Sequence, residues 1–172
     1  VSEIARIIRK NKIKNAVHVI KELKKKDINN ATFKQLFKTK QIKDNKKAVY
    51  ILTKIEKFLS GQKEKFAADI TLEHILPVNP DNECKQQYTV DKKLWEDKDE
   101  WIYRIGNMTL LLSKPNKKAQ NKSPMIKSRE IYKKHTKLEI NKDLKNIKKW
   151  STAEIEKRQE KFAEYASQIW KL

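Results

Sequence analysis

Hydrophobic residues recur every three or four positions along most of the chain, a spacing that predicts a mostly helical protein. The clearest case is segment 45–60, which is followed by Gly61 where a helix would end. The apolar stripe of this segment consists of Ala48, Ile51, Leu52, Ile55, Phe58 and Leu59. A similar stripe in 13–23, which includes His18, and a shorter one in 31–37 complete a predicted N-terminal helical block.

The C-terminal part predicts one long final helix. Ser151 and Glu154 have the spacing of a capping box, in which the two side chains satisfy backbone donors at the start of a helix. Apolar residues then follow on one face as far as Ile169. Trp150 and Trp170 flank this segment, and we interpret both as anchors in the core.

The middle of the chain departs from the helical spacing. Residues 70–76 and 107–112 are rich in β-branched and apolar side chains, which predicts two strands. An acidic connection with a short helix near 98–105 separates them, and the helix-competent segment 116–121 follows the second strand. The predicted fold is therefore α+β and mostly α-helical, with a β-β-α order at its centre.

The charge of the chain changes this picture by suggesting a partner. The formal net charge is +19, and such an excess is typical of proteins that bind polyanions, because Lys and Arg attract phosphates and release counterions. Only five of the 41 basic residues are Arg, and a bias towards Lys, Asn and Ile can also come from an AT-rich genome. The distribution is more informative: residues 1–66 and 113–172 carry net charges of +13 and +10, whereas residues 67–112 carry −4.

Other global features narrow the class of protein. The chain begins at Val1 without a signal-like segment, so we expect it to be a piece of a longer protein. It contains no apolar run long enough to span a bilayer. The single cysteine, Cys84, excludes a disulfide framework and paired-cysteine zinc sites. These features predict a cytoplasmic protein without a membrane partner.

Candidate chemistry begins in segment 70–80, ITLEHILPVNP, where Glu73 and His74 lie side by side. Adjacent residues of a regular strand point to opposite faces, so the two side chains can share a site only where the strand ends or bends. Pro77 gives the strand a reason to end there. Taken alone, the pair is also compatible with a structural or surface role.

Two amides extend the pattern. Asn107 follows Gly106 at the start of the second predicted strand, and Asn116 lies nine residues later, at the start of the predicted helix. The order His74, Asn107, Asn116 around a β-β-α unit resembles the HNH family of nucleases, whose fold is also called ββα-metal or His-Me finger. The family's acidic residue, His and Ile-x-Pro correspond here to Glu73, His74, Ile75 and Pro77.

A narrower resemblance covers residues 68–172. It rests on LEHILP at 72–77, RIGNMTLL at 104–111, NKSPMIKSREIY at 121–132, and a Trp before a capped final helix that ends in IW. These motifs are similar to the C-terminal nuclease domain of GmrSD-like proteins, which belong to modification-dependent restriction and phage defence in bacteria. The resemblance implies a connector in residues 1–66, a nuclease domain in 67–172, and a nucleotide-using sensor domain that precedes this sequence.

Phosphodiester hydrolysis explains the residue types. The reaction needs a deprotonated water, a sink for charge on the phosphate and help for the leaving oxygen. Neutral His74 is suited to accept the water's proton. Glu73 and Asn116 offer oxygen ligands for Mg²⁺ or Mn²⁺, and Asn121 is the alternative ligand if the helix begins later. The resemblance implies that Asn107 braces the loop and holds the base.

Two questions stay open at this level. Many HNH nucleases have Asp at the position of Glu73, and the longer side chain can shift the metal or serve a partly structural role. Five lysines around the predicted helix are expected to contact DNA phosphates, although a solvated lysine face is the alternative. They are Lys114, Lys117, Lys118, Lys122 and Lys127.

The sequence thus predicts a divalent-metal-dependent DNA endonuclease or nickase. One alternative is a basic nucleic-acid-binding module whose HNH-like core does not cleave. A second is an RNA nuclease that uses the same chemistry on another substrate.

Overall fold

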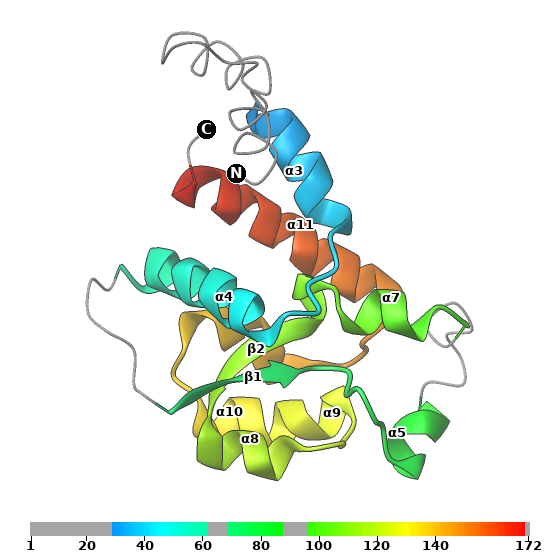
Figure 1. The fold of residues 1–172 in the computed structure, drawn as a ribbon. Coiled ribbons are helices and arrows are strands. Elements are labelled where there is room, and N and C mark those ends of the chain that lie inside the picture. The colour runs from blue at the N-terminus through cyan, green and yellow to red at the C-terminus, as the bar shows by residue number, and fades with distance from the viewer. Residues whose placement is uncertain (1–28, 62–68, 88–95, 171–172) are drawn as a thin grey trace, which may run out of the picture.

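A small antiparallel sheet lies between two groups of helices in the computed structural model, which describes residues 29–61, 69–87 and 96–170 (Figure 1). Helices α4 and α11 lie on one side of the sheet, and the short helices α8, α9 and α10 lie on the other (Figure 1). The three longest helices among the described residues are α3 (Asn30–Thr39), α4 (Asn45–Ser60) and α11 (Thr152–Ile169). The shorter helical elements are α5 (Asn82–Gln87), α7 (Lys98–Ile102), η1 (Ile105–Asn107), α8 (Ser113–Ala119), α9 (Pro124–Lys127), η2 (Ser128–Tyr132), α10 (Lys133–His135), η3 (Glu139–Asn141) and η4 (Asp143–Asn146).

The two strands are β1 (Ile70–His74) and β2 (Met108–Leu112), paired antiparallel with Ile70 opposite Leu112 and His74 opposite Met108. Helix α8 follows β2 directly, so the predicted α+β class and β-β-α order are confirmed. Strand β1 ends at His74, two residues earlier than the hydrophobic pattern suggested. The Ile75 N–H still bonds to the Asn107 carbonyl, but the Asn107 N–H bonds to the Arg104 carbonyl and the Leu76 N–H bonds to the Asn107 side chain, so the strand pairing stops there.

Helix α4 has the ends that its sequence predicts. The Asp44 side chain accepts a hydrogen bond from the backbone N–H of Lys46 at 2.9 Å, and Gly61 closes the helix with a left-handed φ of 66°. The buried face is narrower than the predicted stripe. Ala48, Leu52 and Ile55 are fully buried, whereas Phe58 is 42% exposed and its ring lies tilted beside that of Tyr165.

Helix α11 confirms the predicted capping box, with the Glu154 carboxylate accepting from the backbone N–H of Ser151 at 2.9 Å. It packs closely on η1 at Gly106. A Cβ atom at this glycine would lie 2.2 Å from the carbonyl oxygen of Ile155, so only glycine fits there. This close approach fixes the residue before Asn107 against the long helix.

The sheet separates two hydrophobic clusters. On the α4 side, Leu52 and Ile55 pack with Met108, Leu110 and Phe162. On the α8 side lies a second cluster that joins the residues after β1 to β2, α7, α8, η2 and α11. Its members include Ile75, Leu76, Trp101, Leu111, Ala119, Tyr132 and Trp150. The first cluster therefore combines α4, which precedes residue 66, with elements that follow it. A domain boundary between residues 66 and 67 stays a prediction, and the predicted helix over 13–23 with His18 lies outside the described residues.

No helix within the described part of the chain is long and apolar enough to cross a membrane.

Candidate active site

Glu73 and His74 end β1 on opposite faces of the sheet. Residues directly opposite each other in an antiparallel pair share a face, and His74 is opposite Met108 whereas Glu73 is opposite Thr109. Met108 belongs to the hydrophobic cluster beneath α4, which places His74 on that side. Glu73 faces α9 and lies 2.6 Å from Lys127. The predicted bend that would aim both side chains into one site is therefore not observed, because regular alternation continues to the last residue of the strand.

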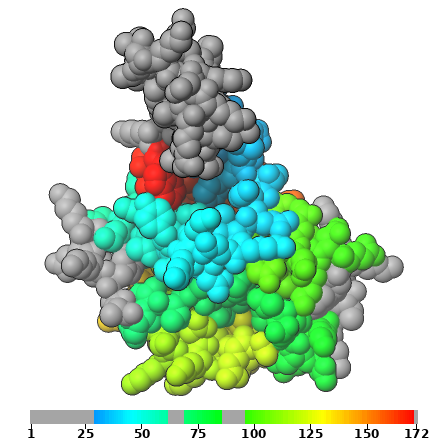
Figure 2. Space-filling model, viewed as in Figure 1, coloured from blue at the N-terminus to red at the C-terminus, as the bar shows by residue number. Residues whose placement is uncertain are grey.

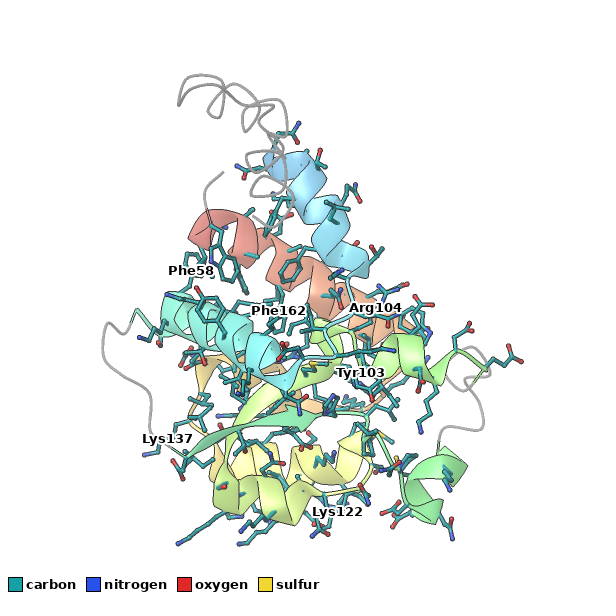
Figure 3. The ribbon with its side chains drawn as sticks, viewed as in Figure 1. Phe58, Tyr103, Arg104, Lys122, Lys137 and Phe162 are labelled. Carbon is teal, nitrogen blue, oxygen red and sulfur yellow. The ribbon has the colours of Figure 1, made fainter. Side chains whose placement is uncertain are left out.

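The imidazole of His74 is largely buried, and one of its ring nitrogens has no hydrogen-bond partner among the described residues. Its ring contacts Tyr103 edge to face, with centroids 6.0 Å apart, and Figure 3 shows Tyr103 on the α4 side of the sheet. The Nε2 atom is buried without a hydrogen-bond partner among the described residues. Burial, assisted by the Lys127 charge, lowers the pKa of His74 to about 4. The ring is therefore neutral at neutral pH and can accept a proton, although it is a weaker base than free imidazole.

Asn107 is fully buried and fastens the chain that follows His74. Its Oδ1 accepts from the Leu76 N–H at 2.9 Å and from Trp150 Nε1 at 3.1 Å. Its Nδ2 donates to the carbonyls of Leu76 at 3.0 Å and Ile102 at 3.2 Å. The Asn107 carbonyl accepts from the Ile75 N–H at 2.8 Å. These bonds engage both the oxygen and the nitrogen of the side-chain amide, so Asn107 contacts protein groups rather than a substrate.

Asn116 lies within α8 and joins this helix to β1. Its Nδ2 donates to Thr71 Oγ1 and to the Leu72 carbonyl, each at 2.8 Å. Both acceptors belong to residues that precede Glu73 in β1. The Asn116 side chain therefore contacts the strand before the point where the Glu73 carboxylate leaves it. Asn121 is exposed on the turn after α8, and because α8 already begins at Ser113 the structure gives no reason to prefer it to Asn116.

Lys127 is completely buried and forms an ion pair with Glu73, with 2.6 Å between Nζ and Oε1. It also donates to the carbonyls of His74 at 2.8 Å and Ile75 at 3.3 Å. Burial raises the pKa of Glu73 and lowers the pKa of Lys127, while the partner's charge opposes each change. The three acceptors around Nζ match the three donors of an ammonium group, so the geometry is that of a charged pair.

The expected phosphate contact of Lys127 is therefore wrong for this structure, because its ammonium does not reach solvent. A helical spacing could have revealed this. Lys127 lies three residues after Pro124 and four before Ile131, both of which are buried. Because the region contains many lysines, the buried position of this one did not stand out in the sequence.

The other four lysines lie on the outside of the molecule. Lys114, Lys117 and Lys118 are exposed on α8, whose surface forms the lower edge of the view in Figure 2. Lys122 is half-exposed on the α8 side of the sheet, where its Nζ lies 3.4 Å from Glu130 (Figure 3). These lysines can meet a polyanion at the surface.

A second basic surface was not predicted. We use the name basic hollow for a surface depression of about 350 Å³ lined by Arg129, Lys133, Lys145 and Lys148 together with Met125, Ser128, Asn146 and Ile147. No acidic side chain is among these lining residues. The hollow forms where the backbone N–H of Ile147 donates to Ser128 Oγ at 3.0 Å. Sequence reasoning missed it because the two lysine-bearing segments meet only in the fold.

The predicted metal ligands do not form a metal centre as the structure places them. The described residues contain no group of three or more His, Cys, Asp or Glu side chains that could hold a metal ion. The Glu73 carboxylate is neutralised by Lys127, and Asn116 directs its amide nitrogen to β1. Asn121 is exposed beyond α8.

Comparison with known proteins gave one family and no curated relative. The family model described as GmrSD restriction endonucleases, C-terminal domain, matches residues 26–165, which is more than half of the chain. The match spans the elements from α3 to most of α11 and includes both strands. No curated protein matches the chain.

Proposed function

The chain belongs to the GmrSD restriction endonuclease C-terminal domain family, and on this premise we propose that it is an HNH-type endonuclease that hydrolyses phosphodiester bonds in DNA. Family membership itself implies a nuclease, a hydrolase with DNA as its substrate. The observation that supports the HNH subtype is the end of β1. There His74 is neutral, and its buried Nε2 has no hydrogen-bond partner among the described residues. The Asn107 side chain holds the backbone that follows, because it bonds to both the N–H and the carbonyl of Leu76.

In the proposed reaction, His74 is the general base. Nε2 accepts a proton from a water molecule, the water oxygen bonds to phosphorus, and the bond from phosphorus to the leaving oxygen breaks. The proton moves to His74, and the leaving oxygen takes a proton from solvent. Asn107 does not touch the reacting atoms in this scheme, because its amide is engaged with protein groups, and it acts by fixing the residues after His74.

The DNA backbone is the proposed contact of the exposed lysines. Lys114, Lys117, Lys118 and Lys122 lie along α8 and the turn after it, where they can neutralise successive phosphates. The exposed basic side chains that we identify are almost all Lys rather than Arg, which favours phosphate contacts over bidentate base recognition. We therefore infer weak sequence preference in this domain.

Several finer points belong to the same proposal. The nuclease family indicates use of a divalent metal ion, and we propose Mg²⁺ or Mn²⁺. The resemblance of the sequence to GmrSD-like proteins supports a role in modification-dependent restriction or phage defence in the cytoplasm. It also supports a nucleotide-using sensor domain N-terminal to this sequence.

One observation favours an alternative. The Glu73–Lys127 pair removes a predicted metal ligand, as expected for a basic nucleic-acid-binding module with an HNH-like core that does not cleave. A third possibility, cleavage of RNA, requires no change in the site. The same assay separates all three functions.

The test is nicking of supercoiled plasmid by the wild type with Mg²⁺ or Mn²⁺, with and without chelator, and with a structured RNA as a parallel substrate. His74→Ala should reduce DNA cleavage by roughly a hundredfold to ten-thousandfold, the range for loss of a general base, while DNA affinity is retained. Undiminished nicking by His74→Ala would remove the catalytic assignment. A wild type that binds DNA without cleaving it under any metal condition would support the binding module.

A further inference from the structure

Lys127 connects α9 to the residues that end β1. Its Nζ reaches the Glu73 carboxylate and the carbonyls of His74 and Ile75, and its side chain is fully buried. Asn107 holds the same stretch from the other side, through the N–H of Ile75 and both backbone groups of Leu76. The backbone from the His74 carbonyl to Leu76 is therefore held by one buried cation and one buried amide.

Such a cation is expensive to bury. An ammonium removed from water is tolerated only when a counter-charge and further acceptors replace its hydration, and removal of one partner leaves an uncompensated charge. Glu73, which is 7% exposed, supplies the counter-charge, and the two carbonyls supply the remaining acceptors. A hydrophobic residue of similar size would avoid this cost. The contact with the carbonyls of His74 and Ile75 is what such a residue could not provide.

We propose that Lys127 is a positioning residue of the active site and that Glu73 is its counter-ion rather than a metal ligand. Lys127 fixes the carbonyls of His74 and Ile75, and it thereby holds the imidazole in the orientation that the base requires. This inference rests on the proposed function, in which His74 accepts the proton. The pairing of Glu73 with Lys127 does not depend on DNA cleavage, so this part of the proposal can be tested even in a protein that does not cleave DNA.

The first experiment compares Lys127→Met with Lys122→Met, a matched substitution at a half-exposed lysine five positions earlier. Misplacement of the base should lower kcat of Lys127→Met about a hundredfold, with KM and DNA affinity within twofold of wild type. Lys122→Met should weaken DNA affinity and raise KM, which is the pattern of a lost DNA contact. Weakened DNA affinity with unchanged kcat in Lys127→Met would overturn the proposal, since it would make Lys127 a DNA contact.

A readout that needs no activity is the NMR signal of the His74 ring. The signal should shift in Lys127→Met and stay in place in Lys122→Met, and Lys127→Arg should partly restore both the signal and kcat because it keeps the charge. An unchanged His74 signal in Lys127→Met would contradict the positioning role. If Lys127→Met does not fold, Lys127→Arg takes its place: its kcat and its His74 signal should both differ from wild type, and wild-type values of both would contradict the positioning role.

The pairing is tested by thermal unfolding of Glu73→Gln, Lys127→Met and the double variant. Each single substitution should lower the melting temperature by several degrees because it leaves one buried partner alone. The double variant should lose less than the sum of the two. Additive losses would show that Glu73 and Lys127 do not depend on each other, and would overturn the assignment of Glu73 as a counter-ion.

The role of Glu73 is tested separately by Mn²⁺ binding to the protein–DNA complex, followed by electron paramagnetic resonance. Glu73→Gln should bind Mn²⁺ within about twofold of wild type, whereas the loss of a metal ligand lowers affinity tenfold or more. A tenfold loss would restore Glu73 as a ligand and overturn this part of the proposal. A wild type that neither cleaves DNA nor binds Mn²⁺ would refute the proposed nuclease function, while the melting experiment would still decide the pairing.

Discussion

At the scale of single residues, the burial of His74 makes the stability of the folded protein depend on pH. Its pKa is about 4 in the folded protein against 6.5 for an ordinary histidine. Between these pH values the unfolded chain binds a proton that the folded protein does not. The contribution of neutral His74 to stability is therefore complete above pH 6.5 and is lost as the pH falls through 4. One pKa unit corresponds to about 1.4 kcal/mol, and partial exposure of the ring reduces the total to about 2–3 kcal/mol.

The measurement is urea unfolding of wild type and His74→Gln at pH 7 and pH 4. The wild type should lose about 2–3 kcal/mol more than the variant, since glutamine does not titrate. Carboxylates also change charge as the pH falls, but they are common to both proteins. Parallel losses in the two proteins would contradict the burial of a neutral His74.

The hydrogen bonds of Asn107 also contribute to the stability of the fold. Asn107→Ala leaves the Leu76 N–H, the Leu76 carbonyl and Trp150 Nε1 without their partner. Each unsatisfied buried group costs about 1–3 kcal/mol, so we expect a loss of roughly 3–5 kcal/mol in the free energy of unfolding. Asn146→Ala, at an exposed asparagine, should change it by less than about 0.5 kcal/mol. Equal, small effects at both positions would show that the Asn107 bonds do not stabilise the fold.

The residues of the candidate site could be singled out from the sequence, whereas several of their contacts could not, for a physical reason. His74, Asn107 and Asn116 stood out because their residue types and spacing resemble a known pattern. The Glu73–Lys127 pair did not, because it joins residues 54 positions apart and a lysine is expected at the surface. Trp150 was correctly expected in the core, but its hydrogen bond to Asn107 depends on how the chain returns after η4.

At the scale of elements, the agreement is closest where local sequence rules decide. Asp44, Gly61 and the capping box of Ser151 and Glu154 mark helix ends that need no tertiary information. Buried polar groups on helices escaped prediction. Glu56 in α4 accepts from the backbone N–H groups of Glu139 and Ile140, and Arg158 in α11 donates to the carbonyls of three other segments. Periodicity treats such residues as solvent-facing.

The packing of α11 on η1 gives a prediction at this scale. Gly106→Ala would place a methyl group 2.2 Å from the Ile155 carbonyl, so one of the two elements must move. We expect a loss of about 3 kcal/mol or more, the upper range for overpacking, together with reduced nicking because Asn107 shifts with η1. Gly61→Ala is the matched control. It meets no atom within 4 Å and should cost only about 1 kcal/mol for its left-handed φ. Thermal unfolding of the two variants provides the measurement, and equal losses would contradict the close contact.

At the scale of the whole molecule, charge sets the response to salt. DNA affinity should fall steeply with salt concentration on logarithmic axes, by about 0.9 in slope for each phosphate neutralised. Replacing Lys133, Lys145 and Lys148 of the basic hollow with Gln should reduce that slope by about two to three if DNA crosses the hollow. Lys46→Gln, on the exposed start of α4, is the control for loss of charge elsewhere. Binding titrations over a series of salt concentrations would show this, and an unchanged slope in the triple variant would exclude the hollow from the DNA path.

The hydrophobic cluster under α4 also determines how this protein can be produced in pieces. A gene cut between codons 66 and 67 would remove Leu52 and Ile55 and leave Met108, Leu110 and Phe162 without cover. Exposed apolar surface of this kind drives aggregation, so such a fragment would collect in inclusion bodies even though it keeps His74, Asn107 and Asn116. An expression clone that starts before α3 keeps the sheet covered and is the one from which soluble enzyme can be purified.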